Sequence, residues 1–325
     1  MSRIKYQHYV PRFYLEGFQD NSFKSWCYDK VTGKAFRQSP DTLGGERLFY
    51  DLPEADKETG VEQFLEKWFW PLETDAAQTL KRWLDRLTAS AVFSPSASEM
   101  AVMAQFVAIQ ELRTPTARQE AVAITELATT ISFFNHLGET APEVAAKIEN
   151  PIEALKVRLS RDRWPCAHAM ILMDVPLIEE MAEILLRHVW VVAKNPTPSS
   201  NYTSDHPIVR RSHVQHPVLK MRGLTSPGIQ IVYPLSPQHS LNILERTFWK
   251  HLEPFHLGVL PRPMNEEAVR FDNAAQVGES RRFVYCRDND FGLARELCER
   301  CPELRDPERP ALMSEPGTGG GKNAG

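Results

Sequence analysis

Residues 61–87 read VEQFLEKWFWPLETDAAQTLKRWLDRL, and this stretch decides the fold class. Its large apolar side chains recur four residues apart at Phe64, Trp68 and Leu72, and again three and four apart at Leu80, Trp83 and Leu87. This spacing places them on one face of an amphipathic helix. Pro71 lacks an amide hydrogen and should kink that helix. The sequence therefore predicts a helical region that begins near residue 61.

The helical pattern continues well past this stretch. A helix should begin in SPSASE, residues 94–99, because serine followed by an early acid is typical of a helix start. It should end at Arg113, since Thr114 precedes Pro115 and a residue before proline avoids the helical conformation. Further helices are predicted over 115–134, 151–161 and 176–187. The helical subregion thus spans residues 61–187.

Short strands flank this subregion on both sides. Residues 24–28 and 35–38 should pair as a β-hairpin, with Gly33 in the turn at a positive φ. The other predicted strands are 47–52, 188–193, 200–205, 229–235, 239–244 and 281–286. The sequence therefore predicts an α+β fold, in which a central helical bundle packs against a small, mostly antiparallel sheet formed by N-terminal and C-terminal strands. A helix is also expected at 265–280.

The length of 325 residues suits one large domain or two intimately packed ones, and a single α+β domain is expected over residues 1–304. No internal repeat is visible. Residues 305–325 end in GTGGGKNAG and show no apolar periodicity. They are predicted to be a disordered tail.

Charge and composition limit the classes of function. The 325 residues carry a formal net charge of −4 at pH 7. This charge argues against affinity that comes mainly from a phosphate backbone, although a local basic cleft could still bind nucleic acid or a nucleotide. No run approaches the ~20 apolar residues that span a bilayer, so no membrane partner is expected. Irregularly spaced cysteines without an apolar export signal favour reduced thiols and a cytoplasmic location.

The N-terminal stretch YQHYVPRFYLEGF, residues 6–18, places a histidine among aromatic residues. His8 stands where the chain should enter a short helix, and an ordinary pKa near 6.5 suits a general base or a metal ligand. The alternative is a core histidine whose ring nitrogens bind the backbone. Periodicity alone favours this alternative.

A second candidate lies in NYTSDHPIV, residues 201–209. Asp205 ends a predicted strand, where it could orient a histidine or bind a metal ion, and Ser204 could donate a hydrogen bond. Alternatively, Asp205 accepts hydrogen bonds from the amides of its own turn before Pro207. The sequence does not decide between these two interpretations.

Arg113 and Arg118 flank a helix break in ELRTPTAR. Two guanidinium groups there could clamp a phosphate or a carboxylate. Alternatively, Arg113 caps the carbonyl groups at its helix end, or pairs with a buried acid such as Glu62 or Glu111.

Two further patterns are weaker. Three histidines fall close together, at His206, His213 and His216. With Asp205 they could supply metal ligands, but prolines dominate the segment and a loop is expected. Cys298 and Cys301 form one CxxC pair without a second, which gives little support for a zinc or redox site. P-loop, Rossmann and nucleophile-elbow motifs are absent from the sequence.

Several of these segments together resemble a bacterial family of domains of unknown function. The N-terminal signature of that family is matched by Gln7, His8, Val10, Pro11, Tyr14, Leu15 and Phe18. Further matches are Gln110, Arg113, Thr114 and Pro115, the Thr-Ser-Asp-x-Pro residues Thr203, Ser204, Asp205 and Pro207, the turn 233–237, Asn273, and 282–284. The likeness covers almost the whole chain up to about Asp288 and implies no particular reaction. It favours functional roles for a polar trio: His8, Arg113 and Asp205.

Two hypotheses from different classes follow. The first is a hydrolase of a phosphate-containing substrate, nuclease-like, in a bacterial defence or toxin context, with His8, Arg113 and Asp205 as catalytic residues. The expected substrate-binding residues are Gln7, Ser204 and Arg118. No metal ligand is assigned, although a divalent metal ion could serve as cofactor. The second is a non-enzymatic sensor or interaction module with a protein partner, in which the trio forms a structural network.

Overall fold

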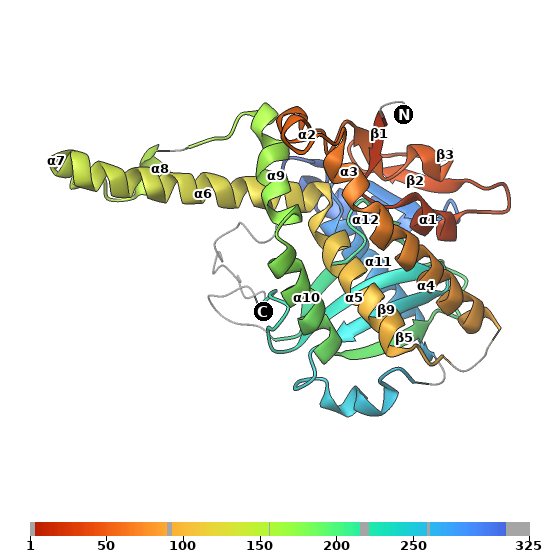
Figure 1. Ribbon diagram of the computed structural model, residues 1–325. Coiled ribbons are helices and arrows are strands. Elements are labelled where there is room, and N and C mark those ends of the chain that lie inside the picture. Colours follow the sequence, from red (N-terminus) through yellow and green to blue (C-terminus); the bar gives the residue numbers. More distant parts are fainter. Residues whose placement is uncertain (1–3, 90–92, 156, 215–220, 259–260, 310–325) are drawn as a thin grey trace.

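The computed structural model describes residues 4–89, 93–155, 157–214, 221–258 and 261–309 (Figure 1). These residues form helices and three β-sheets, of which the largest has five strands. The predicted α+β fold is confirmed, and the sheets are small and mostly antiparallel.

The larger sheet has the strand order β10-β5-β9-β8-β7. Its strands are β5 (Val189–Lys194), β7 (Val209–Ser212), β8 (Ile229–Ser236), β9 (His239–Leu244) and β10 (Arg262–Pro263). Neighbouring strands are antiparallel except β10 and β5, which run parallel. Every residue of β9 is buried, as expected for a central apolar strand with both faces covered.

A four-stranded sheet joins distant parts of the chain in the order β3-β2-β11-β6. Its strands are β2 (Ser25–Asp29), β3 (Lys34–Gln38), β6 (Thr203–Ser204) and β11 (Phe283–Cys286). The predicted hairpin β2–β3 is confirmed, with Gly33 at φ 70° in its turn. β11 pairs with β2 on one side and with β6 on the other. The third sheet contains only β1 (Tyr6–His8) and β4 (Gly45–Arg47).

Helices cover both larger sheets. The α-helices of the described residues are α1 (Arg12–Leu15), α2 (Pro53–Thr59), α3 (Phe64–Trp68), α4 (Trp70–Thr88), α5 (Ala97–Leu112), α6 (Pro115–Thr140), α7 (Pro142–Ala145), α8 (Pro151–Leu155), α9 (Trp164–Leu172), α10 (Val175–Arg187), α11 (Glu266–Glu279) and α12 (Gly292–Arg300). Short 3-10 helices are η1 (Glu16–Phe18), η2 (Pro40–Thr42), η3 (Arg161–Arg163), η4 (Lys250–Phe255) and η5 (Pro302–Arg305). α4, α5 and α10 pack together over the five-stranded sheet, whereas α11 and α12 pack on the four-stranded one (Figure 1).

α5 lies at the centre of the main core. The ring of Phe106 on α5 lies 6.3 Å from that of Tyr233 on β8, measured between ring centroids. On the neighbouring α4, Trp83 makes an edge-on contact with Trp190 of β5 at 6.4 Å. Because α5 is buried almost throughout, the residue that follows it, Arg113, also lies in the interior.

The predicted helix starts at 94–99 and 115 are confirmed by their caps. The hydroxyl oxygen of Ser96 accepts a hydrogen bond from the amide of Glu99, whose carboxylate accepts one from the amide of Ser96. The hydroxyl oxygen of Thr114 accepts a hydrogen bond from the amide of Ala117, with Pro115 in the first turn of α6.

Other boundaries differ from the expectation. Pro71 does not kink one helix but lies in the first turn of α4, where its missing amide hydrogen costs nothing. The strand predicted at 47–52 is wrong, because Leu48 has a positive φ of 57° and the chain turns there into α2. Strands β7 and β10 were not predicted, and the helix expected over 151–161 ends at Leu155.

The outer part of α6 projects from the molecule, together with α7 and α8 (Figure 1). We call residues 124–155 the arm. The 26 residues of α6 correspond to a helix of about 39 Å, and its base packs against α9. One face of the arm is covered by the returning chain. There Leu159 donates its amide hydrogen to the carboxylate of Glu126 (2.9 Å), and Arg158 forms an ion pair with the same carboxylate (3.0 Å).

Most of the tail predicted to be disordered, residues 310–325, lies outside the described residues. Before it, Arg309 donates from Nη2 to the carbonyl oxygen of Gly278 (2.9 Å) at the end of α11. Within the described part of the chain, no helix combines the length and apolar character needed to cross a membrane.

Candidate functional site

Arg113 lies at the centre of the structure and is 1% exposed. Its Nη1 donates to the carboxylate of Glu73 (2.5 Å) and its Nη2 to the carbonyl oxygen of His8 (2.6 Å). Its Nε donates to the hydroxyl oxygen of Tyr50 (3.4 Å), and its Cζ lies 4.3 Å from the ring centroid of Phe69. Burial opposes the charge of Arg113, but Tyr50 and Glu73 outweigh it and raise its pKa. The guanidinium group is therefore engaged by the protein itself.

His8 belongs to β1 and is half-buried. Its Nε2 lies 3.3 Å from the carbonyl oxygen of Pro40, and its ring meets that of Tyr6 edge-on at 5.2 Å. Because a carbonyl oxygen can only accept, this contact requires the proton on Nε2 and leaves Nδ1 as an acceptor. Burial and the charge of Arg113 lower the pKa of His8. The imidazole is therefore neutral at pH 7.

Asp205 follows β6 and is 2% exposed. Its Oδ1 accepts from the amide of Arg281 (2.8 Å), and its Oδ2 accepts from the amides of Arg282 (2.7 Å) and Phe283 (2.8 Å). The carboxylate thus fixes the connection between α11 and β11, a segment far from its own turn. Among the described residues, no hydrogen bond or ion pair joins Asp205 to the other two members of the trio.

The expected substrate-binding residues Gln7 and Ser204 are also buried. The side-chain oxygen of Gln7 accepts from the amide of Tyr50 (2.6 Å). Ser204 donates from its hydroxyl group to the side-chain oxygen of Gln276 on α11 (2.8 Å). Both side chains therefore connect elements of the fold.

Arg118, the third of these residues, lies in the first turns of α6. Its Nε donates to Nδ1 of His168 on α9 (3.2 Å), and its Nη2 donates to the carbonyl oxygen of Phe49. Its Cζ lies 3.4 Å from the centroid of the Phe49 ring. Burial lowers the pKa of Arg118 to about 10. Arg118 thus connects the base of α6 to α9 and to the segment that holds Phe49.

Hydrogen bonds connect the segments that carry the motifs. The hydroxyl group of Tyr14 donates to the carbonyl oxygen of Pro234 (2.7 Å) and lies 2.7 Å from that of Thr203. The hydroxyl oxygen of Thr114 lies 2.7 Å from Nδ1 of His206, and burial lowers the pKa of that imidazole to about 3. The motif residues therefore lie in one interior region, where they link β1, α5 and the strands after residue 200.

The carboxylates nearest Arg113 come from α3 and α4, and not from Glu62 or Glu111. Glu111 forms an ion pair with Arg210 of β7 instead. Glu66 has a buried carboxylate oxygen, Oε2, with no hydrogen-bond partner among the described residues. Burial raises the pKa of Glu66 to about 7; the charge of Arg113 opposes this shift and that of Glu73 adds to it. The seven-residue interval between Glu66 and Glu73, two helical turns, was the only signal for this pair in the sequence.

Among the described residues, the histidine and cysteine patterns form no common site. His213 lies 2.7 Å from the side-chain oxygen of Gln230, and His216 lies outside the described residues. Cys298 belongs to α12 and is buried, and Cys301, which follows the helix, is half-buried. In the described part of the chain, no group of three or more His, Cys, Asp or Glu side chains could hold a metal ion.

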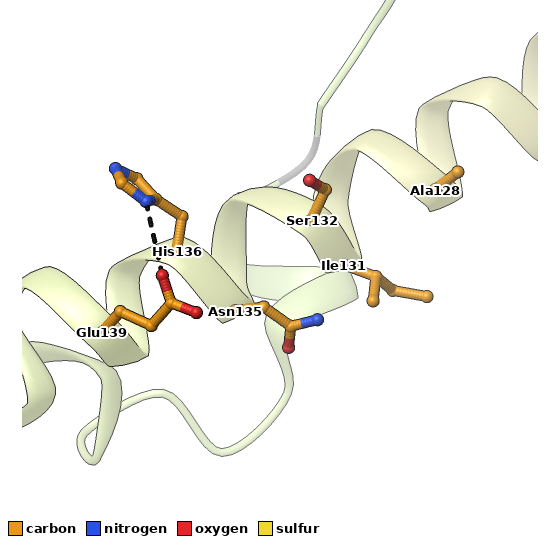
Figure 2. Close-up of a pocket in the computed structure, with 6 residues that line it drawn as sticks. All are labelled: Ala128, Ile131, Ser132, Asn135, His136 and Glu139. Carbon is orange, nitrogen blue, oxygen red and sulfur yellow. Dashed lines mark ion pairs between the residues drawn. The ribbon is translucent and has the colours of Figure 1, made fainter.

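The arm carries the other candidate site. Ile124, Leu127 and Ile131 lie on one face of α6 and are 63%, 43% and 48% exposed; we call them the aliphatic row. An open depression lies beside this row on the same helix (Figure 2). Its lining residues are Ala128, Ile131, Ser132, Asn135, His136 and Glu139. For this segment the sequence predicted only a helix over 115–134, and the aliphatic row was not predicted.

The fold and site define an α+β protein with a buried polar network and a projecting helical arm. A family model described as "Protein of unknown function (DUF4238)" matches residues 6–290. The chain therefore belongs to the DUF4238 family, which confirms the resemblance to a family of domains of unknown function. No curated protein and no solved structure matches the chain significantly.

Proposed function

We propose that the protein acts by binding another protein through the arm, as an interaction module. The observation that carries this proposal is the uncovered aliphatic row on the projecting part of α6. Full burial of an exposed aliphatic side chain of this size is worth about 1.5–3 kcal/mol, and roughly half of this remains to be gained at each position of the row. A partner that covers the row would therefore form a more stable complex. An exposed apolar face of this kind marks a binding surface.

The two faces of α6 support this interpretation. Thr130 faces the returning chain and is 4% exposed, whereas Ile131, the next residue, is 48% exposed. If only packing within the molecule had determined the residue types of this helix, its outward face would be expected to be polar.

The contacts of the polar trio also support this proposal. His8, Arg113 and Asp205 each make contacts that join elements of the fold. A buried group engaged in this way is costly to remove, because its partners lose their hydrogen bonds. A structural role therefore accounts for the trio without a substrate.

Affinity capture with two matched variants tests the proposal. Ile131→Glu changes the aliphatic row, and Phe133→Glu changes a residue on the opposite side of the same helix that is 51% exposed. Both should keep the melting temperature of the wild type, since both side chains are already exposed. Proteins captured by the wild type should be retained by Phe133→Glu and lost with Ile131→Glu. If both variants retain them equally, the proposal is wrong.

A second candidate function is hydrolysis of a phosphate-containing substrate, and Glu66 is the feature that favours it. A carboxyl group with a pKa of about 7 can act as a general acid near neutral pH. His8, neutral and with Nδ1 free to accept, could act as the base. Nearby, Arg113 fixes Glu73 in place.

An activity assay tests this candidate. Purified protein would be incubated with nucleotides and nucleic acids, with and without Mg²⁺ or Mn²⁺. Glu66→Gln and His8→Ala should abolish hydrolysis, whereas Glu62→Gln, at an exposed position of the neighbouring turn, should not. Absence of hydrolysis by the wild type, or full activity in Glu66→Gln, would exclude it.

A further inference from the structure

We propose that the arm pairs with the arm of a second copy of this chain, in antiparallel orientation, about a two-fold axis at the level of residue 129. The inference rests on the proposed function, because it names the protein that the aliphatic row binds. It follows from the spacing, the symmetry and the charge of the row.

The spacing of the row is that of a coiled-coil seam. Ile124, Leu127, Ile131 and Phe134 follow one another at intervals of three, four and three residues. These are successive a and d positions of a heptad, which face a partner helix. Phe134 is half-buried at the edge of the returning chain and extends the row on that side.

The row is complementary to itself when reversed. In an antiparallel pair of helices, an a position of one chain packs against a d position of the other. Ile124 would meet Phe134 of the second copy, and Leu127 would meet its Ile131. Both pairs are centred on residue 129, so one two-fold axis generates four apolar layers over about 15 Å. Such an interface is isologous and closes as a dimer.

Charge also favours a second copy. The positions that flank the seam are Ala128, Thr130, Asn135 and Leu137, and none carries a charge. In the antiparallel register Glu126 lies level with Ser132 of the second copy, and Glu139 lies level with Gln119. No carboxylate therefore meets another within the four apolar layers. Glu139 comes within one residue of the level of Glu120 of the second copy only beyond these layers.

The depression in Figure 2 fits the edge of this interface. Ile131 lines the side of the depression that is next to the aliphatic row. Ser132, His136 and Glu139 line the side toward the opposite face of α6. Nδ1 of His136 lies 3.9 Å from Oε2 of Glu139, and both side chains are exposed. A polar margin beside an apolar seam is the arrangement expected at the rim of a protein–protein interface.

Analytical ultracentrifugation over a concentration series tests the inference. The full chain should shift from 37.1 kDa toward about 74 kDa as its concentration rises. Leu127→Glu and Ile131→Lys should each remain monomeric, and Phe133→Glu should dimerise as the wild type does. All three positions are exposed in the monomer, so circular dichroism should show unchanged folding.

Mixing the two seam variants tests the orientation. In the antiparallel pair, Glu at 127 of one copy meets Lys at 131 of the other, and the second Leu–Ile layer remains native. An equimolar mixture should therefore recover the dimer. In a parallel pair residue 127 meets residue 127, so no Glu–Lys layer forms. Seam variants that lose the dimer without recovery on mixing would overturn the antiparallel register.

Two further outcomes separate this inference from the proposed function. A wild type that stays monomeric at every concentration would overturn pairing with a second copy, and so would a dimer insensitive to both seam variants. In either case the capture experiment still tests the proposed function. A different protein that binds the wild type but not Ile131→Glu would support that function.

Discussion

Replacing Asp205 with asparagine separates the structural role of this residue from a catalytic one. Its carboxylate accepts three backbone hydrogen bonds, from Arg281, Arg282 and Phe283. Asparagine has one acceptor oxygen. If that oxygen serves Arg282 and Phe283, the amide of Arg281 faces an NH₂ group and loses its bond. Hydrogen bonds to a charged group contribute about 1.5–3 kcal/mol each and neutral ones about 1, so exchanging three of the first kind for two of the second costs at least about 2.5 kcal/mol. We therefore expect a loss of about 3 kcal/mol, toward the lower end of this range.

This loss is measurable by urea denaturation and thermal melting. At roughly 2 °C per kcal/mol for a chain of this size, the melting temperature should fall by about 6 °C. Asp75→Asn, a matched change at an exposed position of α4, should shift the free energy of unfolding by no more than about 0.5 kcal/mol. An Asp205→Asn protein as stable as the wild type would refute the structural role.

Three further predictions concern the same network. Glu66→Gln should leave the free energy of unfolding unchanged at pH 4 and raise it at pH 8: burial raises the pKa of Glu66 from 4.5 to about 7, so the wild type loses stability as pH rises through this interval. Urea denaturation at both pH values checks this. Arg113→Lys should cost about 3 kcal/mol in the same assay, since one ammonium group cannot reach all three partners of the guanidinium. Tyr14→Phe should cost about 1–3 kcal/mol, because it leaves the carbonyl oxygen of Pro234 without its donor; an unchanged melting temperature would contradict this.

Local patterns in the sequence predicted much of the secondary structure. The hairpin around Gly33 and the helix starts at Ser96 and Thr114 depend on nearest neighbours along the chain. Leu48 could not be predicted in the same way. Its positive φ follows β4, which pairs with β1 some forty residues earlier, so the strand expected at 47–52 was wrong.

The site was predictable in part. His8, Arg113 and Asp205 were indicated by their places at helix and strand ends and by the family resemblance, and the structure brings His8 and Arg113 together. Their contacts could not be read from the sequence, because Arg113 binds the backbone of His8 and not its side chain. A contact made through the backbone does not determine which amino acid stands at that position. The ion pair between Glu73 and Arg113 was not predicted either, because the two residues are far apart in the sequence and the residues around Glu73 do not indicate the pairing.

By itself, the sequence determined the class of fold and the positions of most helices, since both depend on spacing along the chain. It also indicated His8, Arg113 and Asp205, but not the partners Tyr50 and Glu73 that bind Arg113. Only the tertiary structure decided which groups those residues bind and which apolar positions stay uncovered. Ile124, Leu127 and Ile131 have the spacing of core residues. They became a candidate binding surface only because the packing of α9 and the returning chain leaves their side of α6 open.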